Sequence, residues 1–199
     1  IDIIGHIIQE WFGLFLTKNK IKWSAPDNTQ EYPDFILDHD QHLELKCYDA
    51  TKRAAFDLAN FKSLIDDLVI NPQRINTDYI VFNYKLSSNQ KYIINDYRIR
   101  KIWQMTTSST QGRTQGLITA QQKKGVIYNL RPYGSFFSNP DKTFNNKGQF
   151  LYVMSKTIDS FSDQLIDQKT SYNNGTEWLN IIQNIYKTRT GKDILTELE

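Results

Sequence analysis

The sequence predicts an α/β protein in which a mixed β-sheet is flanked by helices. Residues 2–16 carry large apolar side chains at the spacing of an amphipathic helix. In residues 32–48, apolar and polar side chains alternate on both sides of a polar centre, as in a β-hairpin. Residues 78–86 form an apolar run typical of a buried strand. The chain has 199 residues, of which 39% are hydrophobic and 23% charged, so we expect residues 1–199 to form a single domain.

The hairpin is the most informative stretch. A three-residue loop at 38–40 would pair residue 37 with residue 41 and residue 35 with residue 43. Because side chains alternate along a strand, this register sorts the hairpin into two faces. The apolar face carries Phe35, Leu37, Leu43 and Leu45, and the polar face carries Asp34, Glu44 and Lys46.

The polar face has the chemistry of a divalent metal site. Two neighbouring carboxylates, Asp34 and Glu44, repel each other unless a cation lies between them. Mg²⁺ binds one or two carboxylates together with waters and phosphate oxygens. Lys46 would emerge beside the ion, where it could orient or help deprotonate the attacking water and offset phosphate charge. The alternative is an ordinary exposed hairpin with solvated charges.

These residues match a known pattern. Pro33-Asp34, nine intervening residues and then Glu44-Leu45-Lys46 resemble the PD-(D/E)xK nuclease motif. The resemblance implies a restriction-endonuclease-like core and Mg²⁺ bound by Asp34, Glu44 and the carbonyl of Leu45. In such enzymes an acidic residue on an early helix often joins the site. Glu10 is the candidate besides Asp2, and the alternative for Glu10 is a solvated helix surface.

Several scattered segments look like the NgoBV and NlaIV type of restriction enzyme. They are the strands of the hairpin, residues 56–61, residues 102–105 and residues 128–132. This resemblance implies a type II restriction endonuclease from a bacterial cytoplasm that cuts double-stranded DNA as a homodimer, at a short palindromic site. Two alternatives stay open: a repair or junction-resolving nuclease with the same site, and a non-catalytic DNA-binding module.

Polar residues beyond position 105 are candidates for contacts with DNA. Residues 106–116 are polar and aperiodic, and two further polar segments follow on and around predicted strands. Arg and Gln side chains read base edges, and Lys side chains bind phosphates. The candidates are Arg113, Gln115, Gln121, Gln122, Lys123, Lys124, Asn129 and Arg131. The alternative for residues 106–116 is a flexible surface loop.

Hydrophobic periodicity and capping residues in the rest of the sequence predict further helices and strands. We expect a helix capped at residues 49–51 that ends near residue 71, and a short basic helix at 98–103. Further strands are predicted at 91–94, 117–120, 126–130 and 150–154, and helices at 158–166 and 177–186.

Composition excludes several classes of protein. A net charge of +2 neither requires nor excludes nucleic acid. Cys47 is the only cysteine, so an internal disulfide framework is excluded, and we expect a small buried apolar residue there. No apolar run reaches the length of a membrane-spanning helix, and the first residues lack the basic segment of a signal peptide. The three histidines show no zinc-site spacing with Cys47.

Overall fold

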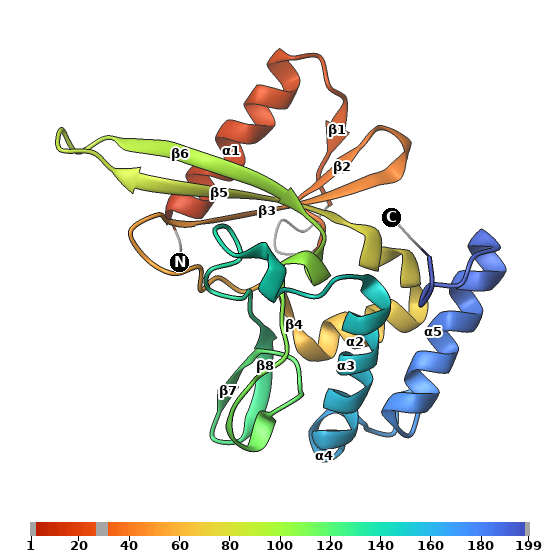
Figure 1. The fold of residues 1–199 in the computed structure, drawn as a ribbon. Coiled ribbons are helices and arrows are strands. Elements are labelled where there is room, and N and C mark those ends of the chain that lie inside the picture. The colour runs from red at the N-terminus through yellow and green to blue at the C-terminus, as the bar shows by residue number, and fades with distance from the viewer. Residues whose placement is uncertain (1–2, 27–31, 198–199) are drawn as a thin grey trace. The chain divides into compact units, whose positions relative to one another are not determined.

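A computed structural model describes residues 3–26 and 32–197 (Figure 1). Asp2, one of the two candidate acids on the first helix, lies outside the described residues. The chain divides into two compact units, which we treat separately. The sheet unit comprises Ile1–Phe56 and Thr77–Lys101, and the helical unit comprises Asp57–Asn76 and Ile102–Glu199.

A five-stranded mixed sheet forms the sheet unit, with strand order β1-β2-β3-β5-β6. Strands β3 and β5 run parallel, and the other neighbours run antiparallel. The elements are α1 (Ile3–Lys18), β1 (Trp23–Ser24), β2 (Phe35–Leu37), β3 (Gln41–Asp49), β5 (Asp78–Leu86) and β6 (Tyr92–Arg100). The predicted mixed α/β sheet is confirmed.

The hairpin of β2 and β3 has the predicted register. Phe35 lies opposite Leu43 and Leu37 lies opposite Gln41, and a 3-10 turn at Asp38–Asp40 joins the strands. His39 adopts a left-handed conformation there, with a φ of 62°. Because register decides which face every side chain occupies, this pairing places the apolar face of the hairpin in the core.

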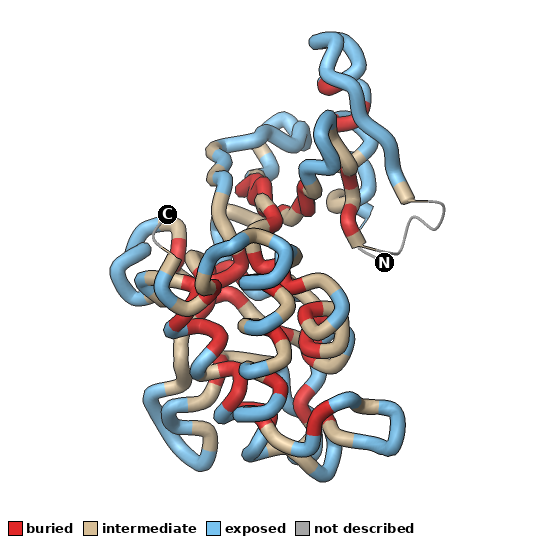
Figure 2. Tube along the Cα trace, turned by 90° about the vertical axis from the view of Figure 1, so that its right-hand side faces the viewer, coloured by how far each residue is buried: buried red, intermediate tan, exposed pale blue. Residues whose placement is uncertain are grey.

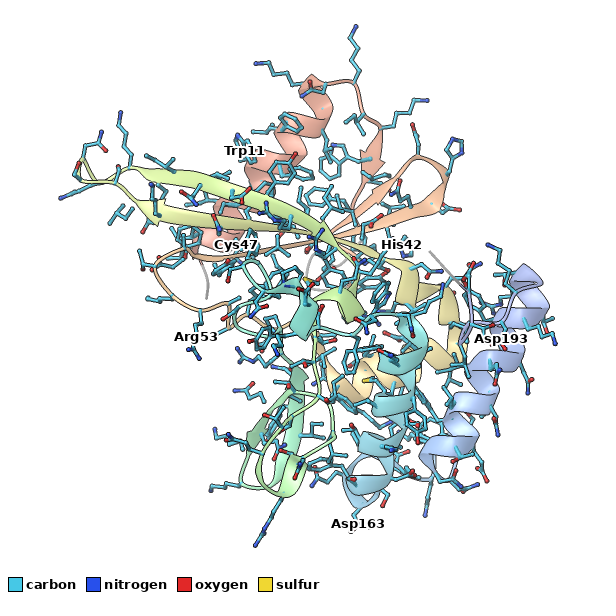
Figure 3. The ribbon with its side chains drawn as sticks, viewed as in Figure 1. Trp11, His42, Cys47, Arg53, Asp163 and Asp193 are labelled. Atoms are coloured by element: carbon cyan, nitrogen blue, oxygen red, sulfur yellow. The ribbon has the colours of Figure 1, made fainter. Side chains whose placement is uncertain are left out.

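Helix α1 packs its buried face on the sheet. Ile8, Phe12 and Leu16 contribute to one apolar cluster with residues from three strands. The strand residues of this cluster are Phe35 of β2, Leu43, Leu45 and Cys47 of β3, and Ile80 and Phe82 of β5. Cys47, labelled in Figure 3, is buried there as a small apolar side chain, as predicted.

Helices and a small antiparallel sheet form the helical unit. Strands β4 (Ala59–Asn60), β8 (Val126–Leu130) and β7 (Ala120–Lys123) pair in that order. The helices are α2 (Phe61–Ile70), α3 (Lys147–Ser160), α4 (Ser162–Leu165) and α5 (Gly175–Thr190). Trp178 of α5 is fully buried and its indole N–H donates to the carbonyl of Ile65 at 2.9 Å, which ties α5 to α2 (buried positions are red in Figure 2).

The helix after β3 begins later than predicted. Asp49 accepts hydrogen bonds from the N–H and hydroxyl of Thr51, at 2.9 and 2.7 Å, and this closes a turn instead of capping a helix. The helix starts at Phe61 because the side chain of Asn60 accepts the N–H of Ser63 at 3.0 Å.

Other predicted elements were wrong or displaced, and the predicted helix at 158–166 is divided between the end of α3 and α4. Residues 150–154 lie in helix α3, where the buried residues Phe150, Leu151, Met154 and Ile158 recur at helical spacing. The predicted basic helix at 98–103 is instead the end of β6 followed by a 3-10 turn at Ile102–Met105. Strand β7 begins at Ala120 instead of residue 117. Among the described residues, no helix is long and apolar enough to span a membrane.

Gly175 provides a test of the contact between α5 and α3. A Cβ atom at this position would lie 1.9 Å from the carbonyl oxygen of Ser155, a backbone atom that cannot rotate away. We expect Gly175→Ala to lower the free energy of unfolding by about 1–3 kcal/mol. Thr176→Ala, at the exposed next position, should change it by less than about 0.5 kcal/mol. Urea unfolding of both variants measures the difference, and equal effects would contradict the proposed clash.

Candidate active site

Alternation along β3 separates the core from a polar site. Leu43, Leu45 and Cys47 join the apolar cluster that contains α1, so Glu44 and Lys46 project from the opposite face of the strand. Asp34 lies directly before β2, at the point where this strand leaves β3. The structure therefore brings the three residues of the motif to one end of the hairpin.

Asp34 is held by two hydrogen bonds. Its Oδ2 atom accepts the backbone N–H of Leu45 at 2.7 Å, and its Oδ1 atom accepts the side-chain N–H of Gln9 at 3.1 Å. The pairing of β2 with β3 ends at Phe35, so the carboxylate takes the place of a strand carbonyl as acceptor for Leu45. These two donors fix the orientation of the Asp34 side chain.

Glu44 and Lys46 form an ion pair inside the site. The Lys46 Nζ atom lies 2.7 Å from Oε1 of Glu44, and both side chains are largely buried, with exposed fractions of 22% and 11%. The second oxygen of Glu44, Oε2, is buried and has no hydrogen-bond partner among the described residues. Buried carboxylate oxygens rarely lack a partner, so this atom is available to a ligand.

The site carries more negative charge than its surroundings stabilise. Burial, and then the charge of Glu44, raise the pKa of Asp34 from 3.8 to about 6. Lys46, the N–H of Leu45 and His6 act in the opposite direction and do not cancel the rise. A cation bound between the carboxylates would relieve this repulsion.

The donor set fits a hard divalent cation that keeps part of its water shell. Asp34 and Glu44 supply carboxylate oxygens, and the carbonyl of Leu45 points to the same strand edge as the N–H that Asp34 accepts. Among residues 3–26 and 32–197, no group of three or more His, Cys, Asp or Glu side chains could hold a metal. A cation here would therefore take its other ligands from water or phosphate.

A pocket of about 220 Å³ adjoins Asp34 in the sheet unit. Its α1 wall includes His6, Gln9 and Glu10, and Asp34 and Phe35 lie on the hairpin side. Glu10 is exposed at this pocket, whereas its neighbour Gln9 contacts Asp34 directly.

Sequence reasoning missed Gln9. The available signal was a polar stripe on the helix, because His6, Gln9, Gly13 and Thr17 recur at intervals of three or four residues.

Comparison with known proteins identifies the family. A model of the NgoBV restriction endonuclease family matches residues 1–198. The chain belongs to this family. It is a type II restriction endonuclease, a site-specific deoxyribonuclease, which decides among the alternatives that the sequence left open.

Individual relatives agree with this assignment. The type II restriction enzyme NlaIV of Neisseria lactamica is 29% identical over 198 residues, covering 97% of this chain and 77% of the relative. The type II restriction enzyme NgoBV of Neisseria gonorrhoeae is 35% identical over 113 residues, covering 54% and 63%. A solved structure of NlaIV restriction endonuclease superposes with a TM-score of 0.83 at 29% identity, covering 98% of this chain and 77% of that one.

The residues predicted to contact DNA lie in the helical unit of this restriction endonuclease. Five of them are on the hairpin of β7 and β8 or its turn: Gln121, Gln122, Lys123, Lys124 and Asn129. Asn129 donates to Gln121 across the two strands at 3.3 Å. Arg113 and Gln115 are exposed on a separate segment, around a 3-10 turn, and Arg131 is ion-paired with Asp57 at 2.9 Å.

The electrostatics of the enzyme's polar site can be tested by titration. The folded-state pKa of Asp34 lies above its ordinary value of 3.8, so the folded protein favours the protonated carboxyl. The contribution of Asp34 to the free energy of unfolding is therefore fully present below pH 3.8 and is lost as the pH rises through about 6. Glu44→Gln removes a negative charge that raises the pKa of Asp34, so this pKa should fall. Lys46→Met removes a positive charge that lowers the pKa of Asp34, so this pKa should rise. Carbon NMR of the Asp34 carboxyl measures both, and shifts in the same direction would contradict this account.

Proposed function

We propose that this restriction endonuclease hydrolyses phosphodiester bonds of double-stranded DNA at a short palindromic site with Mg²⁺ held by Asp34 and Glu44. The observation that supports this proposal is a pair of carboxylates beside an ammonium group: Asp34 is partly buried, and the buried Glu44 has an oxygen, Oε2, without a hydrogen-bond partner among the described residues. The remaining candidate ligand is the carbonyl of Leu45. When bound, Mg²⁺ supplies Lewis-acid stabilisation of phosphate charge and lowers the pKa of a coordinated water.

Lys46 acts as the positioning group for hydrolysis in this proposal. Its Nζ atom is already held at the site by Oε1 of Glu44, at 2.7 Å. From there the ammonium donates a hydrogen bond to the attacking water and offsets negative charge on the phosphate. The water gives up a proton as its oxygen forms a bond to phosphorus, the bond to the 3′-oxygen breaks, and the departing 3′-oxygen takes up a proton. Gln9 and Leu45 keep Asp34 in place throughout.

Glu10 is the fourth proposed catalytic residue. It lies on the α1 wall of the pocket that also contains Asp34, and its side chain is exposed. A carboxylate at this position adds negative charge to a site that binds cations, and it can accept a hydrogen bond from a water in the pocket.

The remaining parts of the proposal concern DNA and assembly. Lys123, Lys124 and Arg113 would contact phosphates or guanine, while Gln115, Gln121, Gln122, Asn129 and Arg131 would contact base edges or the backbone. A palindromic site has twofold symmetry, which a homodimer matches. We further propose that residues 1–199 work together as one PD-(D/E)xK nuclease domain in the bacterial cytoplasm, where a single cysteine is compatible with the reducing environment.

Two substitutions test the catalytic assignment. Asp34→Ala and Lys46→Ala should each lower cleavage by at least roughly a thousandfold while leaving DNA binding largely intact. Cleavage is measured on a plasmid of known sequence with Mg²⁺, and mapping the ends identifies the recognition site. The matched controls are Asp38→Ala and Lys85→Ala, which are exposed residues of the same sheet unit. Retained cutting by either test variant would overturn the assignment.

Salt dependence tests the proposed contacts of the β7–β8 hairpin. Replacing Lys123 and Lys124 together with alanine should weaken binding to all DNA sequences and reduce the slope of log K against log salt by about 1 per lysine. Lys187→Ala, at an exposed position on α5, serves as the control. An unchanged slope in the double variant would exclude these lysines as phosphate ligands.

A further inference from the structure

Helix α1 has a second apolar face that the sheet does not cover. Ile8, Phe12 and Leu16 are buried, but Ile3, Ile7 and Trp11, which are spaced four residues apart along another face, are 66%, 58% and 45% exposed. A surface helix normally carries one apolar stripe, whereas a helix that is apolar on two faces is normally covered on both.

A wide apolar groove lies between α1 and β6 in the sheet unit. It has a volume of about 580 Å³, and its floor includes Phe82 of β5 and Tyr97 and Ile99 of β6. Trp11 and Phe15 form the wall on α1. The sheet thus extends beyond the helix that covers it, and Tyr97 and Ile99 remain 55% and 51% exposed.

The area of this surface exceeds what a monomer normally exposes. Aromatic side chains bury about 150–250 Å² each when fully covered, so four that are about half exposed contribute roughly 400 Å². These are Trp11, Phe15, Tyr92 and Tyr97, at 44–56% exposure. The isoleucines Ile3, Ile7, Ile21, Ile94 and Ile99 are 37–66% exposed and bring the total near the ~800 Å² per partner of a stable interface.

Charge argues against DNA as the occupant of the groove. Asp78 is the only charged side chain lining the groove among the described residues. It is neutralised by Lys101 at 2.8 Å, and it accepts a hydrogen bond from Gln41 at 3.0 Å. An uncharged apolar surface offers nothing to phosphates, and it does not repel a second identical surface.

We propose that two copies of this chain dock through this surface, with the exposed face of α1 from each copy in the α1–β6 groove of the other. A ridge and a groove lie side by side on one protomer, which is the self-complementary arrangement that a twofold interface requires. The inference rests on the homodimer proposed above and specifies its interface. The pocket beside Asp34 and the groove have no lining residue in common.

Lysine substitutions on each half of the surface test the interface. We expect Ile7→Lys and Ile99→Lys each to raise the dimer dissociation constant at least about thirtyfold, because each buries an unpaired charge. Ile70→Lys is the matched control, since Ile70 is 69% exposed at the end of α2. Sedimentation across a dilution series measures association, and thermal unfolding verifies that each variant is folded.

A charge pair tests the arrangement of helix in groove. Each dimer contains two helix-in-groove contacts. When Ile7→Lys protein is mixed with Ile99→Glu protein, one contact of the mixed dimer places the lysine near the glutamate and the other contact is unaltered. We therefore expect the two variants to form a mixed dimer. Dimers that persist in both lysine variants, or folded variants that do not form the mixed dimer, would overturn the inference. A monomeric wild type would overturn it together with the homodimer. Neither result affects the roles of Asp34 and Lys46, which cleavage tests separately.

Discussion

The alternation of side chains along β3 is the constraint on which the rest of the sheet unit depends. Leu43, Leu45 and Cys47 enter the apolar cluster beneath α1, and this burial sets the register with β2 and β5. Once these residues are buried, Glu44 and Lys46 must occupy the opposite face. The stability of the core thus places the ionisable groups, and a slip of one residue would exchange core and site.

The site combines this strand geometry with an electrostatic cost. Asp34 replaces the missing strand partner of Leu45 and is held by Gln9, although burial and the charge of Glu44 raise its pKa to about 6. Groups that are costly to ionise in the folded protein and are nevertheless fixed by hydrogen bonds are typical of functional sites. In a restriction endonuclease such a cost is offset when a cation binds, which links the proposed chemistry to the geometry of the hairpin.

Helix α1 serves three purposes through three faces. One face packs on the sheet through Phe12 and its neighbours, and a second presents Gln9 and Glu10 to the pocket beside Asp34. The third is apolar and exposed, with Trp11 beside the groove to β6. The helix therefore contributes to the core, to the proposed catalytic pocket and to the proposed dimer interface through three separate faces.

The sequence alone determined the hairpin register and the sorting of Asp34, Glu44 and Lys46 from the core, because a period of two is a local property. It also determined the limits of β5, because a short continuous apolar run is typical of a buried strand. It misassigned residues 150–154, since a short apolar run suits a strand or a helix and only packing decides. Tertiary structure alone decided the contact of Gln9 with Asp34 across 25 positions, the lack of a partner for Oε2 of Glu44 among the described residues, and the raised pKa of Asp34. Burial and contacts between distant residues exist only once the chain has folded.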